Sequence, residues 1–359
     1  MICKSQIAFI HDFMRNLFVC HTQAQLILAC GLSSVRYKND ENHLILFQDF
    51  LLREDLKKRL DTVFSKTLYL QGIYPKRLDS FREKMKNYPI NDSKIQFFMQ
   101  KPYDMVFTVC DTIYPEQKCM QNAYNLNRDT CFCWLEDGII AYYQNILIRN
   151  GLDSNSFTRF LRRLYFKYYK RLGSFYDRDF NEFGGATYNK TAYCLFPNNI
   201  REPYKSQRNI VEIRKNEFLC GLQAMYSRVV LPIKSGDVII LVDKMDTYAF
   251  PDRVKNSLKS IIEECHLLGK NVFCKFHPRE TDSWDIFNHC YQLEKTIGVE
   301  SIYLSLSDIA NDITIIGIKS TGLMSAKILG FKPISLFNSS GEENTELVNF
   351  YSNIGIEMR

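Results

Sequence analysis

Two adjacent carboxylates directly follow an apolar run at Trp134–Gly138, where the sequence reads Trp-Leu-Glu-Asp-Gly. A hydroxyl group is a poor nucleophile, and a carboxylate within hydrogen-bonding reach can remove its proton as the new bond forms. The charges of Glu136 and Asp137 can repel each other and raise one pKa toward neutrality. Gly138 would let a substrate approach the backbone closely. The motif predicts a general base, and an ordinary acidic turn is the alternative.

A histidine between basic residues follows a second apolar run, at Lys275–Glu280. His277 could protonate or hydrogen-bond a departing phosphate, and Lys275 or Arg279 could add positive charge. Pro278 would stiffen the backbone that aims the imidazole ring. The motif predicts a phosphate contact, and the alternative is a strand stopped by proline beside a surface histidine.

Two hydroxyl side chains and a glycine, Ser320, Thr321 and Gly322, stand between a predicted strand and a predicted helix. Free backbone N–H groups at the start of a helix, together with hydroxyl groups, form an anion site. Ser and Thr also cap helices. Both roles can hold at once, so this motif predicts phosphate binding.

Apolar runs alternate with helical patterns on both sides of a less regular middle segment. We expect strands at Leu17–His21, Leu44–Phe47, Thr67–Gly72, Met105–Cys110, Cys131–Leu135, Val238–Asp243, Asn271–Phe276, Ile302–Leu306, Ile313–Ile318 and Pro333–Phe337. We expect helices at Gln23–Leu32, Leu51–Ser65, Arg77–Lys86, Glu116–Leu126, Ser156–Leu172, Asp252–Leu268, Leu323–Leu329 and Thr345–Tyr351. This alternation predicts an α/β protein with parallel sheets.

The chain has 359 residues, which is too long for one ordinary core and suits two α/β domains. We expect a Rossmann-like domain over residues 1–150, an inter-domain region with a basic helix over 151–208, and a second Rossmann-like domain over 209–359. Two such domains facing a central cleft form the GT-B fold. The three motifs follow strands, and ligands of open α/β sheets bind beyond the carboxyl ends of the strands.

Composition excludes several classes of protein. Hydrophobic residues make up 46% and charged residues 24% of the chain, and the net charge is +6, which is a globular balance. The twelve cysteines are scattered without a C-x-x-C motif, so we expect free thiols in a reducing cytosol and no zinc site. Charged residues interrupt the first 22 positions, and no run of 18 apolar residues occurs. We therefore expect neither a secretory signal nor a membrane span.

The order and spacing of the three motifs resemble those of the bacterial sialyltransferases. His277 lies 141 residues after Glu136, and Ser320 lies 43 residues after His277. The opening segment Asn16–Leu26 is similar to the branch that includes lipooligosaccharide sialyltransferases. Bacterial polysialyltransferases have a near-identical layout.

The resemblance implies a role for each motif. The general base falls on Glu136 or Asp137, and the acid that faces the phosphate falls on His277, with Pro278 shaping the turn. The phosphate-binding hydroxyls fall on Ser320 and Thr321. Many relatives have a Gln-Pro pair where this chain has Leu241–Asp246, so donor contacts from that loop are not carried over.

The resemblance further implies an inverting transfer of sialic acid from CMP-sialic acid to a terminal sugar, such as a galactoside, of a bacterial lipooligosaccharide or capsule. A phosphodiester donor carries one negative charge, which a histidine, two hydroxyls and a helix N-terminus can stabilise without a metal or another cofactor. The alternative is a transferase for another CMP-activated acidic sugar, such as Kdo, legionaminic or pseudaminic acid. A non-catalytic basic binding protein is a remote alternative, and no nucleic-acid module supports a nucleic-acid partner.

A basic stripe is predicted on the helix Ser156–Leu172 from spacing alone. The aromatic residues occupy one face of this helix. Six positively charged residues occupy the other: Arg159, Arg162, Arg163, Lys167, Lys170 and Arg171. No acidic residue lies between Asp153 and Asp177 to neutralise them. We expect peripheral attachment to the anionic inner face of the cytoplasmic membrane, where a glycolipid acceptor would be found. The alternative is a helix that packs through its aromatic residues and leaves a solvated basic face.

Overall fold

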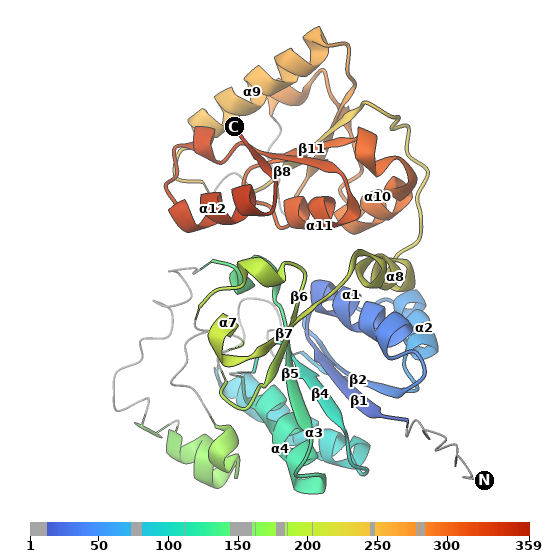
Figure 1. The fold of residues 1–359 in the computed structure, drawn as a ribbon, viewed down its shortest axis with the longest axis vertical. Helices are drawn as coiled ribbons and strands as arrows, with labels where there is room; N and C mark the ends of the chain where they lie inside the picture. Colours follow the sequence, from blue (N-terminus) through green and yellow to red (C-terminus); the bar gives the residue numbers. More distant parts are fainter. Residues whose placement is uncertain are drawn as a thin grey trace, which may run out of the picture.

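The computed structural model describes residues 13–72, 81–111, 113–143, 160–161, 163–176, 184, 186–202, 204–244, 248–277, 280 and 284–359. These residues form two parallel sheets with helices on their faces, one domain above the other (Figure 1). Short helices α11 and α12 line the side of the upper domain that faces the lower one, and α8 lies between the two domains.

The described part of the first domain contains a seven-stranded sheet in the order β3-β2-β1-β4-β5-β6-β7. All of its strand pairs are parallel. The strands are β1 Arg15–Cys20, β2 Glu41–Gln48, β3 Lys66–Gln71, β4 Met105–Thr108, β5 Cys131–Leu135, β6 Thr191–Cys194 and β7 Asn209–Glu212. The main helices are α1 Gln23–Gly31, α2 Glu54–Val63, α3 Phe81–Phe98 and α4 Tyr114–Leu126. The central strands are mostly apolar because helices cover both faces of a parallel sheet.

The described part of the second domain contains a six-stranded parallel sheet in the order β10-β9-β8-β11-β12-β13. The strands are β8 Val238–Val242, β9 Val272–Phe276, β10 Tyr291–Gln292, β11 Thr314–Gly317, β12 Lys332–Ser335 and β13 Glu357–Met358. The helices of this domain are α9 Pro251–Leu267, α10 Val299–Ser305, α11 Gly322–Leu329 and α12 Thr345–Asn353. The short helix α7 Tyr204–Gln207 precedes β7 of the first sheet, and α8 Lys215–Met225 follows that strand.

Two expectations from the sequence need correction. The apolar run at 302–306 is not a strand, because it lies in the helix α10 with its side chains buried. A short buried helix and a buried strand present the same apolar run, which periodicity does not separate. The first sheet also extends past residue 150 and through the predicted inter-domain region, since β6 and β7 belong to it. Both strands have only four residues, and the irregular sequence around them obscured their pattern.

The helix α8, which follows the last strand of the first sheet and leads to the second domain, packs closely on α1 of the first domain. A Cβ atom built on Gly221 would lie 1.9 Å from the carbonyl oxygen of Ile27, and one built on Gly31 would lie 2.1 Å from that of Glu217. Only hydrogen atoms fit between these backbones, so both positions require glycine. An ion pair between Arg36 Nε and Glu217 Oε1 at 2.7 Å flanks the contact.

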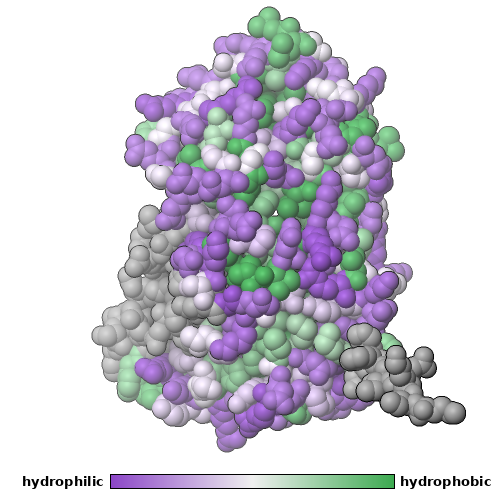
Figure 2. Space-filling view, viewed as in Figure 1, coloured by the Kyte–Doolittle hydropathy of each residue, from purple (hydrophilic) through white to green (hydrophobic). Residues whose placement is uncertain are grey.

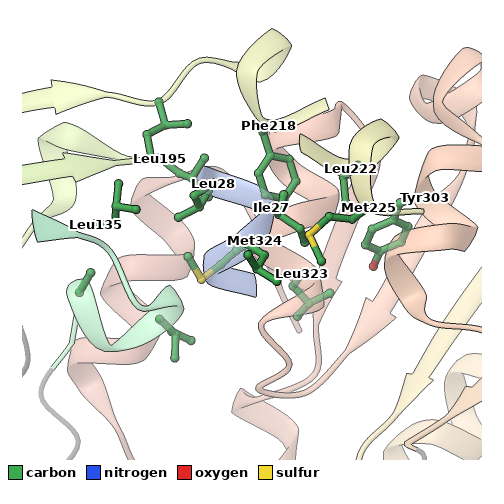
Figure 3. Close-up of a cluster of buried hydrophobic side chains, with 14 of the residues drawn as sticks. Ile27, Leu28, Leu135, Leu195, Phe218, Leu222, Met225, Tyr303, Leu323 and Met324 are labelled. Atoms are coloured by element: carbon green, nitrogen blue, oxygen red, sulfur yellow. The ribbon is translucent and has the colours of Figure 1, made fainter. Parts of the chain in front are cut away.

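An apolar cluster continues from this contact into the second domain (Figure 3). It combines α1, α8, α10 and α11 through the buried side chains of Ile27, Leu28, Phe218, Leu222, Met225, Tyr303, Leu323 and Met324. On the molecular surface, apolar patches reach the solvent near the level at which the domains meet, among mostly hydrophilic residues (Figure 2). The cluster fixes the second domain above the carboxyl ends of the first sheet.

We expect Gly221→Ala to destabilise the protein by about 3 kcal/mol or more, because its methyl group would overlap a backbone carbonyl that cannot move without separating α8 from α1. Urea unfolding measures the loss. Cys220→Ala changes the preceding, partly exposed position of the same helix and serves as the control, with a loss below about 1 kcal/mol. Equal stability of the Gly221→Ala variant and the wild type would contradict the packing described.

Candidate functional site

A cleft of about 740 Å³ lies between the domains and is lined by residues from both. The first domain contributes Gln23, at the start of α1, and Arg53 and Arg59, before and within α2. The second domain contributes, among others, Asp243, Lys275, His277 and Ser320. The last three belong to the two motifs predicted for phosphate binding, and the structure therefore brings those motifs into one cavity.

Three charged or titratable residues follow adjacent parallel strands of the second sheet. Val242 of β8 pairs with Phe276 of β9, and Ile240 pairs with Ile316 of β11, so Asp243, His277 and Lys319 follow at matching positions. The backbone N–H of His277 donates to the carbonyl of Val242 at 2.8 Å. Side chains at matching positions of parallel strands leave the sheet on the same side, and two members of this row, Asp243 and His277, line the cleft.

Asp243 is the most enclosed member of this row. Burial raises its pKa, while the hydroxyl of Tyr248, which donates to Oδ2 at 2.6 Å, and the positive charge of Lys319 oppose that rise. Lys319 Nζ in turn lies 2.9 Å from Glu342 Oε2. Sequence analysis assigned no role to Asp243, although its position directly after a buried strand was a usable signal.

Lys275 is buried, and its ammonium group binds main-chain carbonyls. Its Nζ donates to Phe276 O at 2.9 Å and to Lys295 O at 3.3 Å. Burial lowers the pKa of Lys275. The side chain therefore stabilises the turn that carries the exposed His277, in addition to lining the cleft. Pro278 and Arg279, the other predicted members of this motif, lie outside the described residues.

The hydroxyl motif begins α11 under strong steric constraint. A Cβ atom on Gly322 would lie 2.8 Å from Leu241 Cδ1. The backbone N–H of Gly322 donates to Ser320 Oγ at 3.3 Å, and the hydroxyl of Tyr351 donates to Ser320 O at 3.2 Å. Thr321 is exposed and faces the other domain, because the nearest atom to a Cβ on Gly138 is its Cγ2, at 3.9 Å. Gly138 of the acidic motif and Thr321 of the hydroxyl motif thus lie next to each other where the two domains meet, but Glu136 and Asp137 do not line the cleft.

The two carboxylates of the acidic motif have different surroundings. Glu136 is 2% exposed; its Oε2 accepts the backbone N–H of Leu195 at 2.8 Å and the hydroxyl of Tyr142. Burial raises the pKa of Glu136 to about 8. Asp137 is less buried and accepts from Gln25 Nε2 at 3.1 Å, and burial raises its pKa as well. Gly138 follows with a φ of 59°, which favours glycine.

A buried histidine lies beneath Asp137. His21 Nδ1 is 3.1 Å from Asp49 Oδ2, and Nε2 is 2.9 Å from Glu116 Oε1. Burial alone would lower the pKa of His21, but the two carboxylates raise it to about 9. The backbone N–H of His21 donates at 2.7 Å to Gln25, the residue that binds Asp137. Sequence analysis used His21 and Gln25 only for resemblance, although the capping pattern from Thr22 to Gln25 marked a structured strand end.

Other features are negative for the described part of the chain. No group of three or more His, Cys, Asp or Glu side chains within it could hold a metal ion. The cysteines that it contains are free thiols. Of the helices that it contains, none is both long and apolar enough to cross a membrane.

Comparison with protein families identifies one match, and it covers more than half of the chain. The model of the family described as alpha-2,8-polysialyltransferase (POLYST) matches residues 93–335, a range that includes all three motifs. No curated protein matches the sequence significantly.

Solved structures with the same architecture include sugar-nucleotide enzymes of low sequence identity. UDP-GlcNAc 2-epimerase from Methanocaldococcus jannaschii has a TM-score of 0.52 at 14% identity, covering 96% of this chain and 89% of that chain. The corresponding enzyme from Neisseria meningitidis, bound to UDP-GlcNAc, has a TM-score of 0.51 at 13% identity, covering 94% and 85%. A UDP-glucosyltransferase from Polygonum tinctorium has a TM-score of 0.52 at 8% identity, covering 96% and 84%. These similarities, with the two parallel sheets, confirm the predicted GT-B fold.

We expect the stability of the wild type relative to Glu136→Gln to fall as pH rises from about 4.5 to about 8. The folded protein holds the Glu136 proton up to a pKa of about 8, whereas a glutamate in the unfolded chain has its ordinary pKa of 4.5, so rising pH destabilises only the wild type. The difference amounts to several kcal/mol, since one pKa unit is about 1.4 kcal/mol. Thermal melting between pH 5 and 9 measures it, with the exposed Glu343→Gln as a pH-independent control. Parallel curves for the wild type and Glu136→Gln would contradict the burial of this carboxyl group.

Proposed function

We propose that this chain, which belongs to the alpha-2,8-polysialyltransferase family and is a glycosyltransferase, transfers sialic acid from CMP-sialic acid to a terminal sugar of a bacterial surface glycan. The acceptor sugar would be a galactoside or similar residue of a lipooligosaccharide or capsule. The observation that carries the proposal is that the two domains bring Gly138 of the acidic motif next to Thr321 of the hydroxyl motif, beside the cleft that His277 and Ser320 line.

The proposed reaction is a single inverting displacement. The acceptor oxygen attacks the anomeric carbon while the bond from that carbon to the phosphate oxygen breaks. Glu136 takes the acceptor proton, and its raised pKa makes it a stronger base than an ordinary carboxylate. His277 donates a proton or hydrogen bond to the departing phosphate, which leaves as CMP. Asp137 holds the turn; because it is less buried than Glu136, it is also the alternative base.

We assign the contacts with the phosphate to residues of the second domain. Ser320 and Thr321 offer hydroxyl groups at the N-terminus of α11, where the backbone N–H of the buried Gly322 donates to Ser320 Oγ. The anomeric carbon of a sialic acid is tertiary, so its bond to phosphate breaks early and the leaving group needs charge stabilisation. These groups can supply that stabilisation for a single phosphate, and we propose a reaction that needs no metal or other cofactor. An Asp-x-Asp tripeptide, Asp177–Asp179, lies outside the described residues, so the assay includes a magnesium arm.

A second donor class remains a candidate for the same site. The residues named above would contact the phosphate and the groups at the reacting carbon, and none of them is assigned to the distal substituents of the sugar. Kdo, legionaminic and pseudaminic acid share the acidic anomeric centre and CMP activation. A non-catalytic basic binding protein is set aside, because the family consists of glycosyltransferases.

We expect His277→Ala to lower transfer roughly 10²–10⁴-fold, the usual contribution of general acid catalysis and charge stabilisation. Glu136→Gln should lower transfer by a similar factor and Asp137→Asn by less. Purified protein is incubated with CMP-Neu5Ac and a panel of galactosides, with EDTA in one arm and magnesium in the other, and products are identified by mass. Other CMP-activated acidic sugars replace the donor in parallel reactions.

The exposed His289→Ala is the matched control and should retain wild-type turnover. Calorimetry with CMP separates binding from chemistry, because His277→Ala should still bind CMP. Substituting both Ser320 and Thr321 with alanine should weaken that binding. Near-wild-type turnover of the His277→Ala variant, or equal, mild losses in the two acidic variants, would remove the proposed roles.

We also propose peripheral attachment to an anionic membrane through the described part of the basic segment. Five apolar or aromatic side chains there are between 39% and 74% exposed: Phe160, Leu161, Leu164, Tyr168 and Tyr169. The alternative, a helix that packs through its aromatic residues, therefore does not fit these five positions, although Phe166 is buried. Exposed aromatic and aliphatic groups beside cations are the composition of an interfacial anchor.

The basic residues of this segment are not equivalent. Arg163 and Arg171 are exposed and Lys167 is partly exposed, so all three can reach a charged surface. Lys170 instead forms an ion pair with Asp92 at 3.1 Å, which corrects the expectation that all six charges lack an acidic partner. Arg159 and Arg162 lie outside the described residues.

We expect wild-type protein to co-sediment with anionic liposomes at low salt and to dissociate as salt rises, because each cation near such a surface contributes about 1 kcal/mol. The variant Arg163→Glu/Lys167→Glu should bind at least tenfold more weakly. Lys38→Glu/Lys58→Glu, which changes two exposed lysines elsewhere, should bind like the wild type. If the wild type ignores anionic vesicles, or the first variant binds them equally well, the segment has no such role.

A further inference from the structure

Tyr142 connects the buried Glu136 carboxylate to the backbone of the neighbouring strand. It follows the short 3₁₀ helix Gly138–Ala141 of the acidic motif, and it is buried. Its hydroxyl donates to Glu136 Oε2 and accepts the backbone N–H groups of Leu195 and Phe196, each at 3.1 Å. The position of this one oxygen atom therefore determines how the Glu136 carboxylate is held.

The other partner of Tyr142 comes from the second domain. Its ring stacks on Phe350 of α12 with ring centroids 4.5 Å apart and planes inclined by 5°. Phe196 contacts both rings edge-on, with its centroid 5.7 Å from Tyr142 and 6.0 Å from Phe350. A flat stacked contact restricts the plane of the phenol ring, and with it the direction of the O–H bond. Phe350 is thus the residue of the second domain through which this restriction acts.

We propose that Phe350 is a positioning residue, which holds Glu136 in place through Tyr142 and does so only while the two domains are docked. The stack of Tyr142 on Phe350 is a direct contact between the two domains, whereas the glycine contact of α1 with α8 lies on the first-domain side of the interface. Movement of the second domain would separate Phe350 from Tyr142 and release the phenol ring. The catalytic consequence rests on the proposed function of Glu136 as base, but the mechanical coupling does not.

The electrostatics of the site agree with this geometry. Burial raises the pKa of Glu136, the hydrogen bond from Tyr142 lowers it, and the charge of Asp137 raises it further. The thiol of Cys194 in β6 also faces the carboxylate. From α12, Tyr351 lies near Asp243 and Tyr143. A displaced Tyr142 would withdraw the contact that favours the ionised form, so Glu136 would keep its proton to higher pH.

The decisive measurement is the titration of Glu136 in the whole protein without substrate. The melting temperature of each variant is compared with that of the same variant carrying Glu136→Gln, from pH 5 to pH 10. The difference falls with rising pH until Glu136 is ionised in the folded state, at about pH 8 in the wild type. In Tyr142→Phe the pH at which the difference in melting temperature stops falling should rise by about one to two pH units. This is the usual effect of losing a hydrogen bond to a charged group.

Variants of Phe350 test the contribution of the second domain. Phe350→Leu keeps an apolar side chain without the flat ring. It should raise the pH at which the difference in melting temperature stops falling by about half a pH unit or more. Phe350→Tyr keeps the ring and should retain the wild-type curve. Phe273→Leu alters a buried aromatic residue in β9, whose ring stacks on Tyr291, and should lower melting at every pH without moving the curve. Phe350→Met replaces Phe350→Leu if the latter does not fold.

Transfer kinetics separate this inference from the proposed function. If both are correct, Phe350→Leu lowers kcat by about tenfold with unchanged CMP affinity, and its pH–rate profile moves with its melting curve. A moved melting curve in a protein without transferase activity would refute the proposed function and leave the coupling intact. An unmoved curve in folded Phe350→Leu, or in Tyr142→Phe, would overturn the coupling.

Discussion

The close contact between α1 and α8 is the constraint on which the site depends. Gly31 and Gly221 bring the two helix backbones so near that no side chain fits between them. The apolar side chains around this contact then extend to α10 and α11 of the second domain. Because burial of apolar surface is the main force that holds such an interface, the position of one sheet above the other follows from this cluster. The motifs of the two domains face each other as a result.

Buried ionisable groups follow the carboxyl ends of strands in both sheets, and each has hydrogen-bond or ion-pair partners. Asp243 has Tyr248 and the backbone of Lys319, Glu136 has Tyr142 and Leu195, and His21 has two carboxylates. Burying a charge is costly unless hydrogen bonds or opposite charges compensate it. The first domain meets this requirement with neutral donors at Glu136 and with an ion pair at His21. The result is that Asp137, a carboxyl group with a raised pKa, interacts with His21, an imidazole with a raised pKa.

The interface between the two domains extends to Glu136, the proposed base. Tyr142 belongs to the first domain and Phe350 to the second, and they stack directly beside Glu136. The hydroxyl motif is held in a similar way, since Tyr351 of α12 binds Ser320 and Tyr303 of α10 binds Gly322. Aromatic residues on α10 and α12 therefore support both sides of the cleft. This arrangement makes the geometry of the site a property of the docked domains and of neither domain alone.

The sequence alone determined the α/β class, the parallel sheets and the three strand ends at which the motifs stand. These features depend on local patterns, because a strand buried on both faces needs a continuous apolar run and a turn residue after it. Cys131–Leu135 is a strand with the predicted bounds. The pattern failed for short elements, namely the helix α10 and the strands β6 and β7, because four to seven residues carry too little periodicity to identify their type.

Only the tertiary structure decided which residues share the site. Tyr142 and Phe350 are far apart in the chain, and nothing in either local sequence marks them as partners. The same holds for Lys170 and Asp92, and for the exposed aromatic residues near them. Contacts of this kind arise from how two domains or distant segments pack, and packing depends on the complete set of side-chain volumes at an interface. The sequence therefore located the chemistry at the strand ends, and the docking of the domains determined the environment in which each group ionises.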